Sequence, residues 1–132
     1  NQQDKNGATA LGLAALGGRT AEARLLLEHG ADPNLCTNNG DSPLILAAQA
    51  PGDAGLGAAA LLLDAKADVD HQNGGGSTAL QFACQCSNPD VAELLLERGA
   101  SKDLRDNDGD GVDYYINAAV RREELLALLA RY

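Results

Sequence analysis

Residues 25–34 read LLLEHGADPN, and two related strings follow later in the chain, LLLDAKADVD at 61–70 and LLLERGASKD at 94–103. Each string begins with three leucines, which are typical of a buried helix, and ends in small and polar residues, which are typical of a turn. Such recurrence indicates a repeat protein, in which each unit buries its apolar face against its neighbours.

A second shared string lies upstream of each leucine triplet: Thr9-Ala10-Leu11, Ser42-Pro43-Leu44 and Thr78-Ala79-Leu80. Thr9 and Ser42 are 33 residues apart, whereas Ser42 and Thr78 are 36 apart, so the second unit carries three additional residues, which fall within 50–55. We expect this insertion to be a mobile turn that tolerates deletion, because lengthening a loop costs little. We place the units at 4–36, 37–72, 73–105 and 106–132, within a single domain that spans 1–132.

The shared strings have the composition of helix boundaries. Thr9, Ser42 and Thr78 can each accept a hydrogen bond from an unpaired N–H in the first turn of a helix. Gly30 and Gly99 follow the leucine-rich helices, where a glycine in the left-handed region commonly ends a helix. Each unit therefore predicts two short antiparallel helices, which are stable only when several units stack.

This pattern resembles the ankyrin repeat family. The family places Asp or Asn, two variable residues and Gly before Thr-Pro-Leu-His, and follows them with a pair of Ala, a Leu triplet and Gly-Ala-Asp-x-Asn. The first three units match at the following residues: Asp4, Gly7, Thr9, Leu11, Ala14, Ala15 and 25–34; Gly40, Ser42, Pro43, Leu44, Ala47 and Ala48; Asn73, Gly76, Thr78, Leu80, Ala83 and Gly99. A degraded fourth unit matches at Asp108, Gly111, Ala118, Ala119, Glu124, Leu128 and Leu129. The resemblance implies an all-α fold, an ankyrin repeat solenoid of stacked helix-turn-helix units with short β-hairpin or finger loops.

The chain departs from the family pattern at three kinds of position. The family's His after Leu is replaced by Gly12, Ile45, Gln81 and, in the fourth unit, Tyr115 or Ile116, so the resemblance does not carry over the inter-repeat hydrogen bonds that this His makes. Lys66 occupies the position of Gly30 and Gly99, where a non-glycine residue is strained by about 1–2 kcal/mol. Asp113 stands where the other units have Thr or Ser, and it is expected to cap the last inner helix.

The composition excludes several classes of protein. A formal net charge of −9 disfavours nucleic acid and anionic membranes, which both need a basic surface. The core must be built from Ala and Leu, because the chain has one Phe, no Trp and no Met. Three Cys residues without paired spacing favour a reducing compartment, so we expect a cytoplasmic (intracellular) protein. We also expect the protein to be a monomer.

The two ends of the chain differ in polarity. The last helix carries Arg and Glu residues at 121–124, as expected of a capping repeat, whereas Leu13 and Leu16 in the first helix are apolar. This difference favours a fragment of a longer ankyrin protein over a complete protein of four repeats.

One loop carries the start of a calcium-binding motif. In 106–111, which reads DNDGDG, oxygen-bearing residues stand at positions 1, 3 and 5 and Gly at position 6, as in an EF-hand loop. Position 12 is Asn117 instead of the bidentate Glu, and position 8 is Asp113 instead of an apolar residue. We therefore interpret the loop as a finger enlarged by two residues and expect no metal and no cofactor.

Other reactive residue types fit structural positions. Cys84 and Cys86 are two residues apart on a helix and point in different directions, so they do not make a metal site with Cys36 and His71. We expect Cys84 to be a small buried residue and Cys86 to be exposed. His29 is expected on the surface near a helix end, and the Gly run at 74–76 is expected at a finger tip rather than in a phosphate loop.

Asn34 also fits a family feature. Its spacing from Asp32 and Leu26 resembles that of ankyrin asparagines that can be hydroxylated. The alternative is that its amide simply binds neighbouring loop backbone, and this interpretation is favoured.

The resemblance implies a protein-protein interaction module rather than an enzyme, with no catalytic residues. Family contact positions are the two residues before the finger Gly, one after it, and two after the Ala pair. Carried onto this chain, they are Lys5, Asn6, Ala8, Leu16, Gly17, Asn38, Asn39, Asp41, Gln49, Ala50, Gly74, Gly75, Ser77, Gln85, Cys86, Gly109, Asp110, Val112, Val120 and Arg121. Acidic and basic residues are equally numerous among these positions, so a basic partner is only mildly favoured. The alternative function is a regulatory or targeting domain of an enzyme whose catalytic part lies outside this chain.

Overall fold

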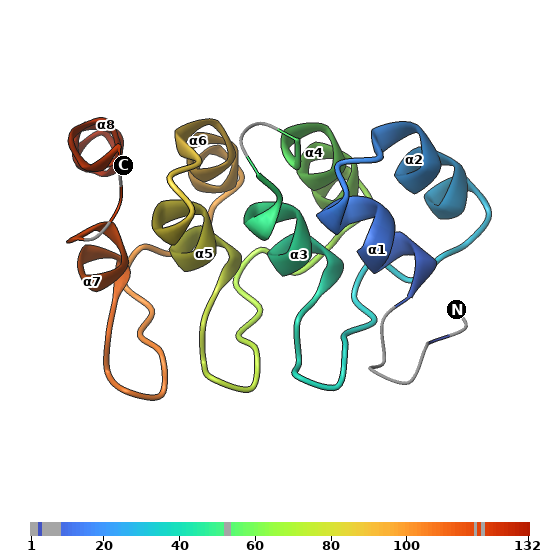
Figure 1. The fold of residues 1–132 in the computed structure, drawn as a ribbon, viewed down its shortest axis with the longest axis horizontal. Coiled ribbons are helices and arrows are strands. Elements are labelled where there is room, and N and C mark those ends of the chain that lie inside the picture. The colour runs from blue at the N-terminus through green and yellow to red at the C-terminus, as the bar shows by residue number, and fades with distance from the viewer. Residues whose placement is uncertain (1–2, 4–8, 52–53, 118, 120) are drawn as a thin grey trace.

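A computed structural model describes residues 3, 9–51, 54–117, 119 and 121–132. The helices are α1 (Ala10–Leu16), α2 (Thr20–Glu28), α3 (Pro43–Gln49), α4 (Leu56–Asp64), α5 (Ala79–Gln85), α6 (Pro89–Glu97), α7 (Val112–Asn117) and α8 (Arg122–Ala130). They pair as antiparallel hairpins, and the hairpins stack side by side in chain order (Figure 1). The predicted fold class is confirmed.

The stack has two layers of helices. The shorter helices α1, α3, α5 and α7 form an inner layer beside the finger loops, and α2, α4, α6 and α8 form an outer layer (Figure 1). Each helix contacts its hairpin partner and the corresponding helix of the next unit. Within the described ranges the fingers are hairpin-shaped loops, and the one antiparallel bridge joins Gln3 to Thr9.

The core is made almost entirely of Ala and Leu. Alanines such as Ala15, Ala47 and Ala83 are fully buried in the inner layer, where their small side chains let adjacent helices approach closely. Leu62 and Leu95 fill the space between the layers and are also fully buried. The predicted Ala and Leu core is therefore present, and no helix of the described residues is long and apolar enough to cross a membrane.

Side-chain caps fix where three inner helices begin. Thr9 accepts a hydrogen bond from Gly12 N, Ser42 from Ile45 N and Thr78 from Gln81 N, as their positions predicted. These bonds satisfy N–H groups that would otherwise be unpaired at the helix start.

Left-handed residues end the outer helices of the first three units. Gly30 and Gly99 have φ of 88° and 90°, and Lys66 occupies the same conformation with φ of 74°. The predicted strain at Lys66 therefore has a structural basis, because its β-carbon crowds the backbone in this region.

Gln81 makes hydrogen bonds at the position of the family His. Gln81 is fully buried, its Oε1 accepts a hydrogen bond from Thr78 N, and its Nε2 donates to the carbonyl of Leu104 at 2.9 Å. A glutamine amide thus replaces the missing His, holding the start of α5 and joining the third unit to the fourth.

The inserted segment of the second unit is anchored at both ends. Ala50 is fully buried, and Asn88 donates hydrogen bonds to the carbonyls of Ala48 and Ala50 at 3.1 Å. At the other end Gly55 is buried close to the Ala47 carbonyl. The expectation of a loop that packs against nothing is therefore wrong for these ends, while 52–53 lie outside the described residues.

The register of the fourth unit also differs from the prediction. Gly109 has φ of 84°, matching Gly40 at 80° and Gly76 at 81°, so Gly109 is the finger glycine and Gly111 is not. Gly109 lies 33 residues after Gly76, so the finger has normal length and is not enlarged by two residues. Helix α7 then begins at Val112, which places Asp113 inside its first turn instead of at the cap.

Candidate protein-interaction surface

The third and fourth fingers are each closed by the residue at their start. In the third unit Asn73 Oδ1 accepts hydrogen bonds from Gly75 N and Ser77 N at 3.0 and 2.9 Å. In the fourth unit Asp106 Oδ1 accepts from Asp108 N and Asp110 N, both at 2.9 Å. A short polar side chain bonded to the backbone two and four residues ahead fixes the turn, so one geometry serves both fingers.

The fingers are also joined to one another near their tips. Gly74 N donates to the Asn39 carbonyl and Asn107 N to the Gly75 carbonyl, both at 2.9 Å. Asn107 Nδ2 adds a bond to the Gly74 carbonyl at 2.9 Å. The second, third and fourth fingers, which lie side by side in Figure 1, are therefore joined into a continuous row by hydrogen bonds.

Close contact between fingers requires glycine at two positions. A β-carbon on Gly40 would lie 2.8 Å from Gly74 N, and one on Gly76 would lie 2.7 Å from Asn107 N. Both contacts are with backbone atoms, which cannot move aside as a flexible side chain can. These glycines therefore serve the left-handed turn and the approach of the next finger together.

Side chains in the loops that lead into the fingers bind the neighbouring loop. Gln72 Nε2 donates to the carbonyls of Gly76 and Arg105 at 2.8 and 3.0 Å. Asn34 Oδ1 accepts from Asp68 N at 2.9 Å, and Asp70 Oδ1 accepts from Ser101 N at 2.8 Å. The favoured interpretation of Asn34, a bond to neighbouring loop backbone, is confirmed.

The predicted contact residues fall into four groups in the structure. Exposed residues are Leu16, Gly17, Asn38, Asn39, Gly74, Gly75, Gln85, Cys86, Gly109 and Arg121. Half-buried residues are Asp41, Gln49, Asp110 and Val112, and the buried ones are Ala50 and Ser77. Lys5, Asn6, Ala8 and Val120 lie outside the described residues.

Two of these residues present almost nothing to a partner. Ala50 has an exposed fraction of 0%, and Ser77 has 8% with its hydroxyl 2.9 Å from the Tyr115 hydroxyl. Arg121 precedes the outer helix α8 and forms an ion pair with Glu124 at 2.6 Å. Ala50 and Ser77 therefore contribute to packing, and Arg121 belongs to the outer layer. None of the three lies on the exposed row of fingers.

Asn107 and Asp108 were missed because the fourth unit was set two residues out of register, and Tyr114 was missed because the contact positions carried over from the family do not include its His position. With Gly109 as the finger glycine, the residues before it are Asn107 and Asp108, and both are exposed. Tyr114 then occupies the family His position, and its exposed fraction is 59%. The spacing of 33 residues from Gly76 to Gly109 was the signal that could have found Asn107 and Asp108.

We define the inner surface as a set of eleven exposed residues from the tips of the second, third and fourth fingers, from α1, α5 and α7, and from the residue that follows α5. Its members are Leu16, Asn38, Asn39, Gly74, Gly75, Gln85, Cys86, Asn107, Asp108, Tyr114 and Asn117. Burial raises the pKa of the Cys86 thiol, so little of it is thiolate at neutral pH.

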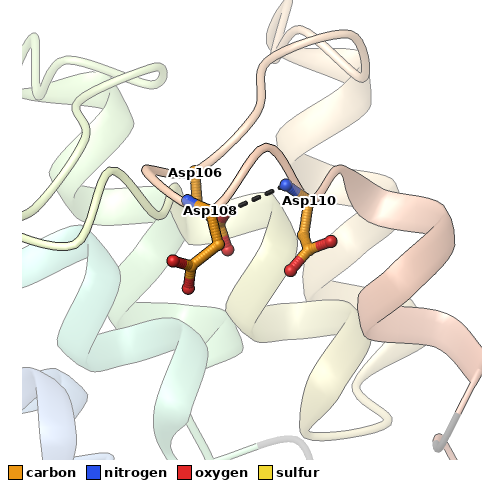
Figure 2. Close-up of side chains that lie close together, drawn as sticks. All are labelled: Asp106, Asp108 and Asp110. Carbon is orange, nitrogen blue, oxygen red and sulfur yellow. Dashed lines mark hydrogen bonds between the residues drawn. The ribbon is translucent and has the colours of Figure 1, made fainter.

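The three carboxylates of the fourth finger lie close together (Figure 2). One oxygen from each of Asp106, Asp108 and Asp110 lies within 4.8 Å of the others. Both Asp106 oxygens are engaged, however, since Oδ1 accepts the two backbone bonds and Oδ2 accepts the Tyr115 hydroxyl at 2.5 Å. Hydrogen bonding, first from Tyr115 and then from the Asp110 backbone, lowers the pKa of Asp106. The resemblance to a calcium loop is thus explained by finger geometry.

The cysteines and histidines take separate positions. Cys84 is fully buried, and burial raises the pKa of its thiol to about 12. Cys36 Sγ lies 3.4 Å from His71 Nε2, which also bonds to the Gly40 carbonyl at 2.8 Å. His29 is exposed beside the end of α2, as expected. The structure therefore brings Cys36 and His71 together but places Cys84 in the core.

Comparisons with known proteins agree with this architecture. Residues 1–73 match the sequence profile of the family described as Ankyrin repeats (3 copies), and residues 62–111 match Ankyrin repeats (many copies). The chain is similar to Neurogenic locus notch homolog protein 1 of Xenopus laevis, at 34% identity, and of Homo sapiens, at 35%, each over 138 residues. It is also similar to Neurogenic locus notch homolog protein 2 of Homo sapiens, at 33% identity over 140 residues.

These alignments cover most of the chain but little of the relatives. They span 81% of this chain for the first two proteins and 80% for the third. The chain in turn spans only 5–6% of the length of the curated relatives that it matches. The similarity therefore concerns one small region of those proteins.

Proposed function

Because the chain belongs to the ankyrin repeat family, we propose that it binds a protein partner through its inner surface. Ankyrin repeats generally mediate protein–protein interaction. The four units act together as one interaction domain, and its role is to bind rather than to catalyse. The side chains that contact the partner come from the finger tips and from the inner helices.

The row of hydrogen-bonded fingers is the observation that carries this proposal. Bonds from Gly74 to Asn39 and from Asn107 to Gly75 hold adjacent tips in fixed relative positions. Loops normally lose conformational entropy when they bind, and loops that are already ordered lose less. Exposed side chains on these tips, such as Asn38 and Asp108, are therefore presented to a partner on a rigid frame.

The net charge supports a protein partner, and the free thiols support a reducing compartment. A net charge of −9 opposes binding to the phosphate backbone of nucleic acid. Cys36, Cys84 and Cys86 are all free thiols, which suits a reducing compartment inside the cell. We therefore place the module in the cytoplasm, as a monomer that binds a protein.

Site-specific photo-crosslinking tests the proposal. A photoreactive amino acid is placed at Asn39 or Gln85 on the inner surface, and in matched variants at Glu22 or Glu97, which are exposed on outer helices. Each variant is irradiated in a lysate of the source cells, and captured proteins are identified by mass spectrometry. We expect the same protein at Asn39 and Gln85 and its absence at Glu22 and Glu97. Equal capture at all four positions, or capture only on the outer helices, would contradict the proposal.

A further inference from the structure

A groove of about 320 Å³ opens between inner helices α5 and α7. Gln85 lines it from α5, and Tyr114, Tyr115 and Asn117 line it from α7. The two tyrosine rings meet edge to face, with centroids 5.6 Å apart and planes at 87°. Tyr114 is 59% exposed, so an aromatic face is open to solvent within the inner surface.

The groove adjoins the carboxylates of the fourth finger. The Tyr115 hydroxyl donates to Asp106 Oδ2, and Asp106 lies within the group formed with Asp108 and Asp110 (Figure 2). Asp113 follows in the first turn of α7. The groove is therefore connected through Tyr115 to the acidic groups of the fourth finger, although no carboxylate is among the described residues that line it.

These carboxylates repel one another. The pKa of Asp110 is raised first by burial and then by the charges of Asp106, Asp108 and Asp113. Arg105 is the cation that opposes this effect, and its guanidinium donates to the Gly109 carbonyl at 3.1 Å. The three neighbouring carboxylates outnumber this one cation, so the negative charge of the fourth finger is only partly compensated.

At its C-terminal end the described inner surface is more negative than the sequence suggested. The near balance of the predicted contact residues depended on Lys5 and Arg121. Lys5 lies outside the described residues, and Arg121 belongs to the outer layer in an ion pair with Glu124. The corrected register adds Asp108, so the described inner surface carries carboxylates at its C-terminal end.

Resting on the proposed function, we propose that this groove binds an arginine or lysine side chain from an extended basic segment of the partner protein. An aromatic face attracts a cation, and adjacent carboxylates pair with it. The exposed amides of Gln85 and Asn117 can donate to and accept from the backbone of such a segment. The groove thus offers contacts for the charged group, for the aliphatic part of the side chain and for the backbone of one basic residue.

An NMR titration of the isotope-labelled 132-residue chain tests this inference. The probe is a short acetylated peptide of alternating alanine and arginine, and the control peptide has citrulline in place of arginine, which keeps the shape and removes the charge. We expect the arginine peptide to shift the signals of Gln85, Tyr114 and Asn117 and the citrulline peptide to leave them unchanged. Binding should weaken as salt is added, because the carboxylates are solvent-accessible.

Variants separate the groove from the general acidity of the chain. Tyr114→Ala should weaken peptide binding by about three- to tenfold through loss of the aromatic face, while Tyr114→Phe should retain it. Asp108→Asn combined with Asp113→Asn should also weaken it. The matched control, Glu28→Gln with Glu97→Gln, removes the same charge from exposed outer positions and should have little effect.

Several results would overturn the inference. They are equal binding of the citrulline peptide, an equal loss in the outer control, or shifts spread over the outer helices. Groove signals that respond to millimolar calcium and not to the arginine peptide would assign the carboxylates to a metal instead. If crosslinking captures a partner at Asn39 and Gln85 while the arginine peptide fails, the proposed function stands and this inference falls.

Discussion

The third and fourth units share a backbone but differ in the side chains that hold it. Their fingers begin with Asn73 and Asp106, which accept the same pair of backbone hydrogen bonds. Both fingers then turn at a glycine of nearly equal φ, 81° at Gly76 and 84° at Gly109. An amide and a carboxylate are interchangeable here because the turn needs only an acceptor oxygen at this place.

The inner helices differ more. In the third unit Thr78 and Gln81 form a capping box, and Gln81 is buried between units. In the fourth unit Gly111 and Tyr114 occupy the same positions, so no side chain stands at the cap and an exposed ring replaces the buried amide. The third unit thus uses a polar side chain to join its neighbour, whereas the fourth unit directs Tyr114 to solvent.

Replacement of Gln81 should produce the largest effect. Gln81→Ala leaves Thr78 N and the Leu104 carbonyl without their partner and opens a cavity. We expect the free energy of unfolding to fall by about 2–3 kcal/mol, measured by urea denaturation. The matched substitution in the fourth unit, Tyr114→Ala, should change it by less than about 0.5 kcal/mol. Equal losses at the two positions would show that burial does not distinguish the units.

Lys66 tests whether the position within the repeat determines the left-handed backbone conformation regardless of the residue that stands there. The second unit ends its outer helix at Lys66, with φ of 74°, where the third has Gly99. Lys66→Gly should therefore raise the free energy of unfolding by about 1 kcal/mol, because glycine occupies this region without strain. Gly99→Ala should lower it by a similar amount. A loss of stability in Lys66→Gly would mean that the lysine side chain contributes more than its strained backbone costs.

Periodicity was sufficient to predict most of this architecture. The leucine triplets, the caps at Thr9, Ser42 and Thr78, and the left-handed residues all follow from local chemistry that a single sequence displays. A threonine or serine before a helix, or a glycine after one, has the same role in any context.

The errors came from contacts between units, which local patterns do not encode. The hydrogen bonds of Gln81 were not predicted, although an amide of similar reach can make the same kind of bond to Leu104. Asn88 closes the inserted turn from 38 residues away, so nothing within 50–55 reveals that Ala50 is buried. In the fourth unit, Asp and Gly alternate, so two registers matched and only the 33-residue spacing distinguished them.

A cap added to the fourth unit should have a small effect. Gly111 stands at the position of Thr78, and Gly111→Ser would supply an acceptor for the first turn of α7. We expect a gain of only a few tenths of a kcal/mol, roughly the difference between serine and glycine at helix caps. Thermal unfolding of Gly111→Ser and of Thr78→Ala under the same conditions compares the two helix caps directly. Thr78→Ala should lower the free energy of unfolding by about 1 kcal/mol. A loss of stability in Gly111→Ser would indicate a clash with Asp113 or Arg105, whose side chains lie close to Gly111.

The smallest change at neutral pH is expected for Asp106→Asn, which gives the fourth finger the chemistry of the third. Asparagine can accept the two backbone bonds as Asn73 does, so the melting temperature should stay nearly the same. The difference should appear in acid. The pKa of Asp106 lies below the ordinary 3.8, so its contribution is present above that value and is lost as pH falls through the lowered pKa.

The neighbouring carboxylate acts in the opposite direction, which sharpens the test. The pKa of Asp110 is raised, first by burial and then by the neighbouring carboxylates, so its protonation as the pH falls removes a partly buried charge and relieves repulsion. Wild-type protein should therefore lose the Asp106 contribution only at the acid end of a denaturation series. Asp106→Asn should lack that loss, because asparagine does not titrate, and Asp110→Asn should lack the earlier gain.

Calcium completes the comparison of the two fingers. A ligand that binds only the native state stabilises it by about 2.7 kcal/mol at a hundredfold excess over Kd. We expect millimolar calcium to leave the melting temperature of wild-type protein unchanged, since both Asp106 oxygens already accept hydrogen bonds. A rise that disappears in Asp106→Asn would show that the carboxylate is needed as a ligand. The fourth finger would then differ from the third in function as well as in sequence.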